Sequence, residues 1–223
     1  MTHSTQTPVK ALQDLGTSHV SDAMDRLGIA GQCLGIMPLD RSFHLAGPAF
    51  TVRYVPVGTD PGSVGDYIDD LDPGTVVVLD NAGRPDTTVW GDLLTATASR
   101  RELGGTVIDG VCRDSDSALE LSYPVYSRGR WMRTGKDRVR VDGYRIPVTV
   151  GGVRIEAGDL LLGDADGVVA VPASRSGEVI AAAEEIRDAE NRIRADIEQG
   201  AALAEARAKA GYHRLQTPRR SGT

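Results

Sequence analysis

Apolar positions near the start of the chain recur at the spacing of amphipathic helices. They do so in the segments VKALQDLG and SHVSDAMDRLG, and Thr17 or Ser18 between them is a residue type that caps helix N-termini. After a stretch rich in Gly and Pro, the segments HLAGPAFTVRYVPV and TVVVLD contain the short β-branched runs of strands, and GTDPG and LDPG predict turns. The pattern therefore predicts two helices followed by strands.

From residue 93 onward helical and strand patterns alternate. The spacing predicts a helix over 93–103, a strand in GTVIDGV, a short helix over 114–121 and a strand in YPVYS. Short apolar stretches with Gly-rich joints then fill 139–172, which is typical of hairpins in a compact antiparallel or barrel-like region. One long amphipathic helix is expected over about 175–209, with Gly200 as the point where it would break.

No repeat, low-complexity tract or linker interrupts this order of elements. We therefore expect a single α/β domain over residues 1–223, with a core over about 15–190 and helical N- and C-terminal flanks.

Charge and cysteine content exclude several classes of function. The chain has 31 acidic and 25 basic residues, a formal net charge of −6, and no run of basic residues longer than the pairs Arg100-Arg101 and Arg219-Arg220, so direct nucleic-acid binding is disfavoured. The N-terminus lacks a basic segment followed by an apolar run, and nowhere do about 18 apolar residues follow one another, so we expect neither secretion nor a membrane span. Cys33 and Cys112 have no second thiol or histidine at ligand spacing, so we expect no disulfide framework or zinc site, and a cytoplasmic protein.

Candidate chemistry lies where the strand GTVIDGV ends. Arg113 and Asp114 follow the last residue of that strand, and Gly91 and Asp92 begin the preceding helix. The first N–H groups of a helix and the positive end of its dipole can hold a carboxylate. An arginine adds a forked cationic contact, and an aspartate can bind a hard divalent cation through oxygen. Together these residues predict a site for a small acid.

Ordinary structural roles compete with this interpretation. Asp114 could cap the helix over 115–121, Arg113 could form a surface ion pair, and Asp92 could be a favourable acid in a first helical turn. At the level of the residues alone these alternatives stay open.

Other polar residues are expected to be structural. Asp109, a carboxylate inside an apolar strand, needs a partner if it is buried, and we expect a hydrogen bond to a neighbouring loop. Asp164 and Asp166 in DADG are expected to form a tight turn rather than a calcium loop, and Cys112 a small core residue. The chain contains no G-x-S-x-G motif, no Gly-rich nucleotide fingerprint after a strand, and no ligand or triad spacing among its histidines, so redox and methyl-transfer chemistry are disfavoured.

The spacing of Asp92, twenty intervening residues and Arg113-Asp114 resembles the signature of class II pyruvate aldolases. That family is the 4-hydroxy-4-methyl-2-oxoglutarate/4-carboxy-4-hydroxy-2-oxoadipate aldolase family, which also contains the regulator of ribonuclease E activity A. The resemblance extends over about residues 15–190 and is carried by TSHVSDAMDRLG, LAGPAFTVRYVP, WGDLLTATASRRELGGTVIDGVCRD, YPVYSRG and IPVTVGGVRIEAGDLLLGDADGVVAVP. Because enzymes and non-enzymatic regulators share most of these segments, the match is specific for the family rather than for one activity.

The resemblance implies a fold and an assembly. The fold is a three-layer β/β/α domain similar to the phosphohistidine (swivelling) domain. The assembly is a homotrimer or a hexamer, with sites in the clefts between subunits.

The resemblance also implies the roles of individual residues. The segment Gly91, Asp92, Leu93 and Leu94 matches the loop whose backbone amides hold the pyruvyl carboxylate. Arg113 matches the residue that contacts the keto oxygen. Asp114 matches the direct ligand of a Mg²⁺ or Mn²⁺ ion, and Asp92 matches the acid that reaches the metal through water. Asp22 is placed near the same cleft.

The implied reaction is the divalent-metal-dependent cleavage of 4-hydroxy-2-oxo acids to pyruvate. Decarboxylation of oxaloacetate passes through the same enolate, so it is expected as a side activity. No lysine occurs between Lys10 and Lys136, which agrees with a mechanism that needs no Schiff base. Two alternatives remain: a regulator of ribonuclease activity that acts by protein–protein binding, and a metal-dependent lyase or isomerase acting on a different small oxo acid.

Overall fold

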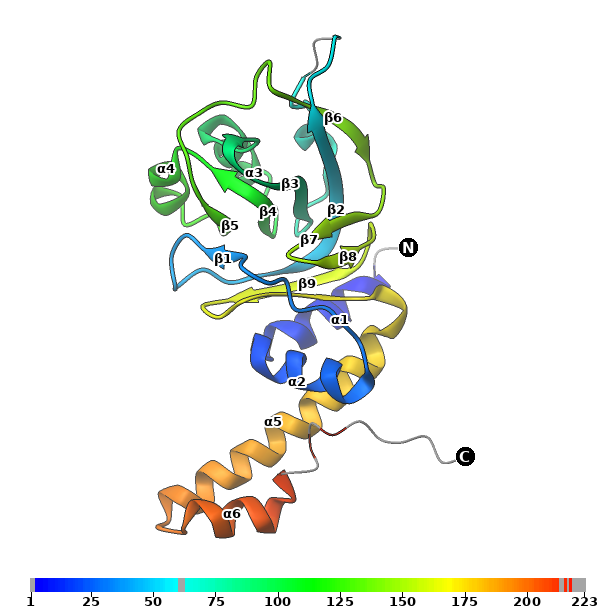
Figure 1. The fold of residues 1–223 in the computed structure, drawn as a ribbon. Helices are drawn as coiled ribbons and strands as arrows, with labels where there is room; N and C mark the ends of the chain where they lie inside the picture. Colours follow the sequence, from blue (N-terminus) through cyan, green and yellow to red (C-terminus); the bar gives the residue numbers. More distant parts are fainter. Residues whose placement is uncertain (1–2, 60–62, 213–214, 216, 218–223) are drawn as a thin grey trace.

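The computed structural model describes residues 3–59, 63–212, 215 and 217 (Figure 1). The turn predicted in GTDPG includes residues 60–62, which lie outside the described residues. The helices are α1 (His3–Gln13), α2 (Thr17–Leu27), α3 (Asp92–Arg100), α4 (Ser115–Glu120), α5 (Ser176–Glu198) and α6 (Leu203–Ala210), with short 3₁₀ helices η1 (Ile68–Asp70) and η2 (Ala173–Arg175). The strands are β1 (Met37–Pro38), β2 (Leu45–Pro56), β3 (Val76–Thr88), β4 (Gly105–Cys112), β5 (Val125–Arg130), β6 (Val139–Tyr144), β7 (Val148–Val150), β8 (Val153–Ile155), β9 (Leu160–Asp164) and β10 (Gly167–Val171).

A mixed sheet occupies the centre of the fold, with the strand order β1-β5-β4-β3-β2 and β6 on the other side of β2. Strands β2, β3, β4 and β5 run parallel to one another, so their carboxyl ends point the same way, whereas β1 and β6 are antiparallel to the strands that they pair with. Parallel neighbours need crossover connections, which α3 supplies between β3 and β4 and α4 between β4 and β5. The predicted alternation of helix and strand after residue 93 is thus confirmed, with both helices slightly shorter than the pattern indicated.

Strand β2 connects two layers of strands. Its first part, residues 45–48, pairs with β9, whereas residues 49–53 pair with β3 in the central sheet. The second layer consists of the β7–β8 hairpin and the β9–β10 hairpin. With α3 and α4 on the opposite face of the central sheet, these layers form the predicted β/β/α arrangement (Figure 1). The hairpins predicted over 139–172 are confirmed except for β6, which pairs with β2 instead of its sequence neighbour β7.

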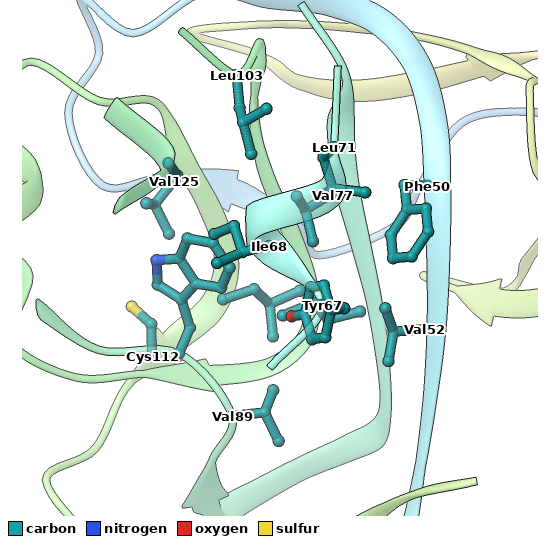
Figure 2. Packing of buried hydrophobic residues seen from close by; sticks show 14 of the residues in the cluster. Phe50, Val52, Tyr67, Ile68, Leu71, Val77, Val89, Leu103, Cys112 and Val125 are labelled. Carbon is teal, nitrogen blue, oxygen red and sulfur yellow. The ribbon is translucent and has the colours of Figure 1, made fainter. Parts of the chain in front are cut away.

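A first apolar core lies between the central sheet and the helices α3, α4 and η1. In Figure 2, Phe50 and Val52 lie on the side of β2 that faces Tyr67 and Ile68, which belong to the segment around η1. Trp90, Ala98 and Ala118 complete this core from the α3–α4 side. Cys112 is fully buried in the same core, and burial raises the pKa of its thiol, so the expected core role of this residue is confirmed.

Strands β9 and β10 are apolar at almost every position because both of their faces are covered. Leu161 and Val168 face a second core against the central sheet, and Leu160, Leu162 and Val169 face a third core. The third core contains residues of α1, α2 and α5, which lie beyond β9 (Figure 1). Strands buried on both faces read as continuous apolar runs rather than as alternating ones.

Asp109 connects the two layers of strands, as its position in an apolar strand predicts. Its side chain is 7% exposed, forms an ion pair with Arg128, and accepts the Gly151 N–H at 3.0 Å. Gly151 follows β7, so the expected hydrogen bond to a neighbouring loop is confirmed. Paired in this way, the buried charge does not carry the cost of an isolated carboxylate.

The start of α2 differs from the prediction. Gly16 occupies the N-cap position without a side-chain cap, so neither Thr17 nor Ser18 has that role. Instead Asp164 accepts both the Thr17 N–H (2.8 Å) and the Thr17 hydroxyl (2.7 Å) from a position 147 residues away. Asp164 also accepts the Asp166 N–H at 2.9 Å within the β9–β10 turn, which confirms the DADG segment as a tight turn.

The C-terminal helical segment is divided near Gly200, as expected. Helix α5 ends at Glu198, and α6 folds back along it after a turn in which Gly200 has φ +92° (Figure 1). Lys209 and Asp196 form an ion pair at 2.9 Å between the two helices. No helix among the described residues is both long and apolar enough to cross a membrane.

Candidate active site

The end of β4 and the start of α3 meet at one place in the fold. The Trp90 carbonyl accepts the Arg113 N–H at 3.2 Å, which ties the residue before α3 to the residue after β4. This bond brings Gly91 and Asp92 next to Arg113 and Asp114, although about twenty residues separate the two pairs in the sequence. The four residues therefore form one cluster.

Gly91 is required by space rather than by backbone conformation. Its φ of −153° is open to any residue. A Cβ atom at this position, however, would lie 2.8 Å from Asp114 Oδ2 and 3.1 Å from Arg113 Nε. The missing side chain lets both charged groups approach the N-terminus of α3.

We expect Gly91→Ala to lower activity without unfolding the protein. The added methyl group must displace the Asp114 carboxylate or the Arg113 guanidinium, and errors of about 1 Å at a reacting centre cost up to roughly 100-fold in rate. The rate of product release at saturating substrate should be measured together with the thermal midpoint. Gly177→Ala is the matched control, because nothing lies within 4 Å of a Cβ there. Equal rates for both variants would contradict the tight packing described for Gly91.

Asp114 does not act as the cap of its own helix. It occupies the N-cap position of α4 in a left-handed conformation (φ 53°, ψ 41°) and makes no side-chain cap hydrogen bond. Its Oδ2 atom instead accepts the Asp92 N–H at 3.2 Å. Positive φ is uncommon for residues other than glycine, although aspartate tolerates it better than most. The carboxylate is thus directed toward α3 rather than toward α4.

Arg113 lies beside this carboxylate with its Nε atom 3.3 Å from Asp114 Oδ2. Their side chains are 37% and 38% exposed, so water screens the pair and its contribution to stability is small. The guanidinium is an always-charged fork that can also contact a second anion. The arrangement is therefore better suited to binding than to holding the fold together.

Two carboxylates already interact with the first amides of α3. Besides the bond to Asp114, the Leu93 N–H donates to Asp92 Oδ1 at 2.8 Å. Helix N-termini favour negative charge because these N–H groups have no partner within the helix. The same amides are the groups that could hold the carboxylate of a small acid.

A cavity of about 220 Å³ opens beside this cluster. Its lining includes all of the residues expected to bind substrate, namely Gly91, Asp92, Leu93, Leu94 and Arg113. Asp114 does not line the cavity, but it accepts a hydrogen bond from Asp92 and pairs with Arg113, which both do. The structure thus brings Gly91, Asp92, Leu93, Leu94, Arg113 and Asp114 together. Asp22, which lies in α2, does not line this cavity.

Sequence reasoning missed the other walls of the cavity. They are Val64, Gly65, Asp66, Thr88, Val89, Trp90, Thr134 and Gly135. The segments 64–66 and 134–135 are distant in the sequence from Arg113, and no local motif marks them. Thr134 reaches the cavity because it pairs with Thr88 of β3 across an isolated bridge.

Two larger cavities, of about 360 and 460 Å³, lie elsewhere, between α2 and β10 and between α1 and β9. Their linings contain carboxylates but no arginine or lysine among the described residues. Volume alone would favour them as binding sites. The smaller cavity is preferred because charged groups of both signs and the first amides of α3 converge on it.

The donor set fits a hard divalent cation that keeps much of its water. Asp92 and Asp114 supply carboxylate oxygens, whereas no group of three or more His, Cys, Asp or Glu side chains suited to a metal occurs in the described part of the chain. Mg²⁺ is typically bound through one or two protein carboxylates plus substrate and several waters. Zinc, which prefers nitrogen and sulfur ligands, does not fit these residues.

Comparison with known proteins gives a consistent family signal. The RraA-like family, described as Aldolase/RraA, matches residues 17–170. Protein DlpA of Legionella pneumophila is 39% identical over 202 residues, which cover 89% of this chain but 33% of DlpA, so the chain spans about a third of that relative. A Halalkalibacterium halodurans protein named "Putative 4-hydroxy-4-methyl-2-oxoglutarate aldolase" is 31% identical over 77% of this chain and 80% of its own length.

A solved structure of a relative from the RNase ES inhibitor RraA protein family has the same fold. Streptomyces coelicolor RraAS2, described as an unusual member of the RNase ES inhibitor RraA protein family, superimposes with a TM-score of 0.79. It is 28% identical, and the match covers 83% of this chain and 96% of that one. Proteins named for an enzyme and a protein named for an inhibitor are therefore both similar to this chain.

Proposed function

This chain belongs to the RraA-like (Aldolase/RraA) family, and we propose that it is a divalent-metal-dependent lyase that cleaves 4-hydroxy-2-oxo acids, of the 4-hydroxy-4-methyl-2-oxoglutarate type, to pyruvate. The observation that carries the proposal is the convergence of Arg113, Asp92 and Asp114 on the N-terminus of α3 beside one cavity. A small acid with a keto group beside its carboxylate matches these charges.

Binding is assigned to the start of α3 and to Arg113. In the proposed complex the substrate carboxylate replaces Asp114 and Asp92 as acceptor of the α3 amides, since a helix N-terminus favours any anion placed there. The guanidinium of Arg113 then lies beside the keto oxygen. Asp114 and Asp92 would hold the cation, Asp114 directly and Asp92 through water.

The reaction breaks the bond between C3 and C4. The electron pair of that bond moves to the keto oxygen as an enolate, the C4 hydroxyl loses its proton and becomes a carbonyl, and protonation of C3 completes pyruvate. A bound divalent cation supplies Lewis-acid stabilisation of the developing oxygen charge. Arg113 stabilises the same charge with fixed N–H donors. We assign the C4 hydroxyl proton to a water molecule held in the site rather than to a side chain.

Two further features belong to this proposal. Oxaloacetate decarboxylation is expected as a side activity, because loss of CO₂ from oxaloacetate leaves the same pyruvate enolate. The protein is expected to act in the cytoplasm as a homotrimer or hexamer, with a small 2-oxo acid as its ligand and without nucleic-acid or membrane partners.

The test is a coupled assay that detects pyruvate. Several 4-hydroxy-2-oxo acids and oxaloacetate are each offered with Mg²⁺, with Mn²⁺, and with EDTA. We expect pyruvate release with either metal and its loss with the chelator. The absence of release from every substrate in the presence of metal would refute the proposal.

A second candidate is a regulator that binds a ribonuclease, which the similarity to RraAS2 favours. A pure binding module has no physical need for the Arg113 guanidinium and the carboxylates of Asp92 and Asp114 beside a cavity. A pull-down with a purified ribonuclease, in parallel with the pyruvate assay, separates the two functions. Binding without pyruvate release would favour the regulator.

A further inference from the structure

The peptide group between Gly91 and Asp92 is held from its buried side. The Gly91 carbonyl accepts the Thr95 N–H at 3.0 Å and the Thr95 hydroxyl at 2.9 Å. The carbonyl of Gly91 and the N–H of Asp92 belong to one planar unit and point in opposite directions. Holding the carbonyl inward therefore directs the Asp92 N–H outward, where it meets Asp114 Oδ2 at 3.2 Å.

Trp90 sets the direction of the Thr95 hydroxyl. Its indole N–H donates to Thr95 Oγ1 at 2.9 Å, and the two residues are 2% and 1% exposed. An indole nitrogen can only donate, so the hydroxyl must accept from Trp90 and turn its own proton to the Gly91 carbonyl. The Trp90 ring is itself held by stacking on Tyr123, with ring centroids 6.2 Å apart.

Thr97 provides an internal comparison on the same helix. Its hydroxyl also donates to the carbonyl four residues earlier, that of Leu93, at 2.9 Å. This pattern is common for threonine within helices and by itself implies no function. Thr95 differs because it is buried, accepts a second hydrogen bond from Trp90, and holds the peptide whose N–H donates to Asp114.

We propose that Thr95, oriented by Trp90, is a positioning residue that aims the amides at the start of α3 at the bound carboxylate. The Trp90 carbonyl also accepts the Arg113 N–H at 3.2 Å. Trp90 therefore fixes the backbone of Arg113 as well as the direction of the Thr95 hydroxyl. This inference rests on the proposed function for its ligand. Its structural part, a fixed peptide between Gly91 and Asp92, stands independently.

The experiment compares Thr95→Val, Thr95→Ser and Thr97→Val in the full chain with Mg²⁺. Valine has nearly the shape of threonine but no hydroxyl, serine keeps the hydroxyl, and Thr97→Val removes an equivalent bond elsewhere on α3. We measure kcat and KM for pyruvate release, pyruvate binding by calorimetry, and hydrogen exchange of the Asp92 amide.

We expect Thr95→Val to raise KM and weaken pyruvate binding by about tenfold, the factor that corresponds to one ordinary hydrogen bond. A smaller change in kcat is expected, because the carboxylate is held in both the ground state and the transition state. Exchange at Asp92 should accelerate by a similar factor. Thr95→Ser should return close to wild type, and Thr97→Val should leave all three measurements within about twofold, since its bond lies at the surface.

Several outcomes would overturn the inference. Unchanged KM and exchange in Thr95→Val, or equal effects in Thr97→Val, would show that the Thr95 hydroxyl is merely structural. If Thr95→Val does not fold, Trp90→Phe replaces it: loss of the indole donor should move KM and exchange in the same direction, and no change would refute the proposal. A wild-type protein that neither releases nor binds pyruvate would refute the proposed function, and the exchange data would still decide whether Thr95 fixes the peptide.

Discussion

Replacement of Asp114 by alanine is expected to abolish metal-stimulated release of pyruvate while the fold remains intact. Asp114 accepts the Asp92 N–H and lies beside the Arg113 guanidinium, and it makes no side-chain cap bond that α4 would lose. Loss of even an outer-shell partner of a metal costs roughly 10- to 100-fold, so loss of a direct ligand should cost more than about 100-fold. The rate should no longer depend on Mg²⁺ concentration.

The measurement is pyruvate release as a function of Mg²⁺, together with the thermal midpoint. Asp116→Ala is the matched control, because Asp116 is an exposed acid in the first turn of the same helix and does not line the cavity. Full activity in Asp114→Ala would remove the metal assignment. A large fall in the midpoint would instead indicate that Asp114 supports the fold.

Arg113→Lys is expected to lower kcat/KM because it removes roughly 2 to 4 kcal/mol of transition-state stabilisation, about the loss seen when one oxyanion donor is removed. Lysine keeps the positive charge but loses the planar fork that can contact a keto oxygen and a carboxylate together. The substitution therefore separates geometry from charge. Because Arg113 is 37% exposed, the stronger hydration of the lysine ammonium carries little cost to stability.

Kinetic constants for Arg113→Lys should be compared with those for Arg100→Lys, an exposed arginine in the last turn of α3 that does not line the cavity. Substrates that differ in the group on C4 should all be affected by a similar factor, since the proposed contact is to the pyruvyl part that they share. A wild-type rate in Arg113→Lys would refute the role of its guanidinium.

Much of the fold follows from local patterns. The β-branched runs of β2, β3 and β4, the helical spacing of α3 and the glycine that separates α5 from α6 predict those elements because each depends on neighbours within a few residues. The buried Asp109 was correctly expected to need a partner, since any carboxylate in an apolar strand does. The resemblance to the aldolase family predicted the β/β/α layers as a whole.

Predictions failed where a distant residue replaced a local one. Thr17 and Ser18 are suitable caps by type, but Asp164 supplies the carboxylate at the start of α2 from the β9–β10 turn. Strand β6 follows the hairpin pattern of its neighbours, yet it pairs with β2, because the free edge of β2 lies beside it in space. The structure also excludes the open alternative that Asp114 caps α4, because its left-handed backbone directs the carboxylate to α3.

By itself the sequence determined the order of helices and strands and the pair of charges, Arg113 and Asp114, placed after a buried strand. Only the tertiary structure decided which groups share the cavity. Asp66 and Thr134 come to it from separate segments, and the hydrogen bond between Trp90 and Thr95 holds the start of α3 from its buried side. The physical reason is that the spacing of apolar residues indicates only which face of a helix or strand is buried. The partner of a side chain depends on how the layers pack, and neighbouring positions in the sequence do not specify that packing.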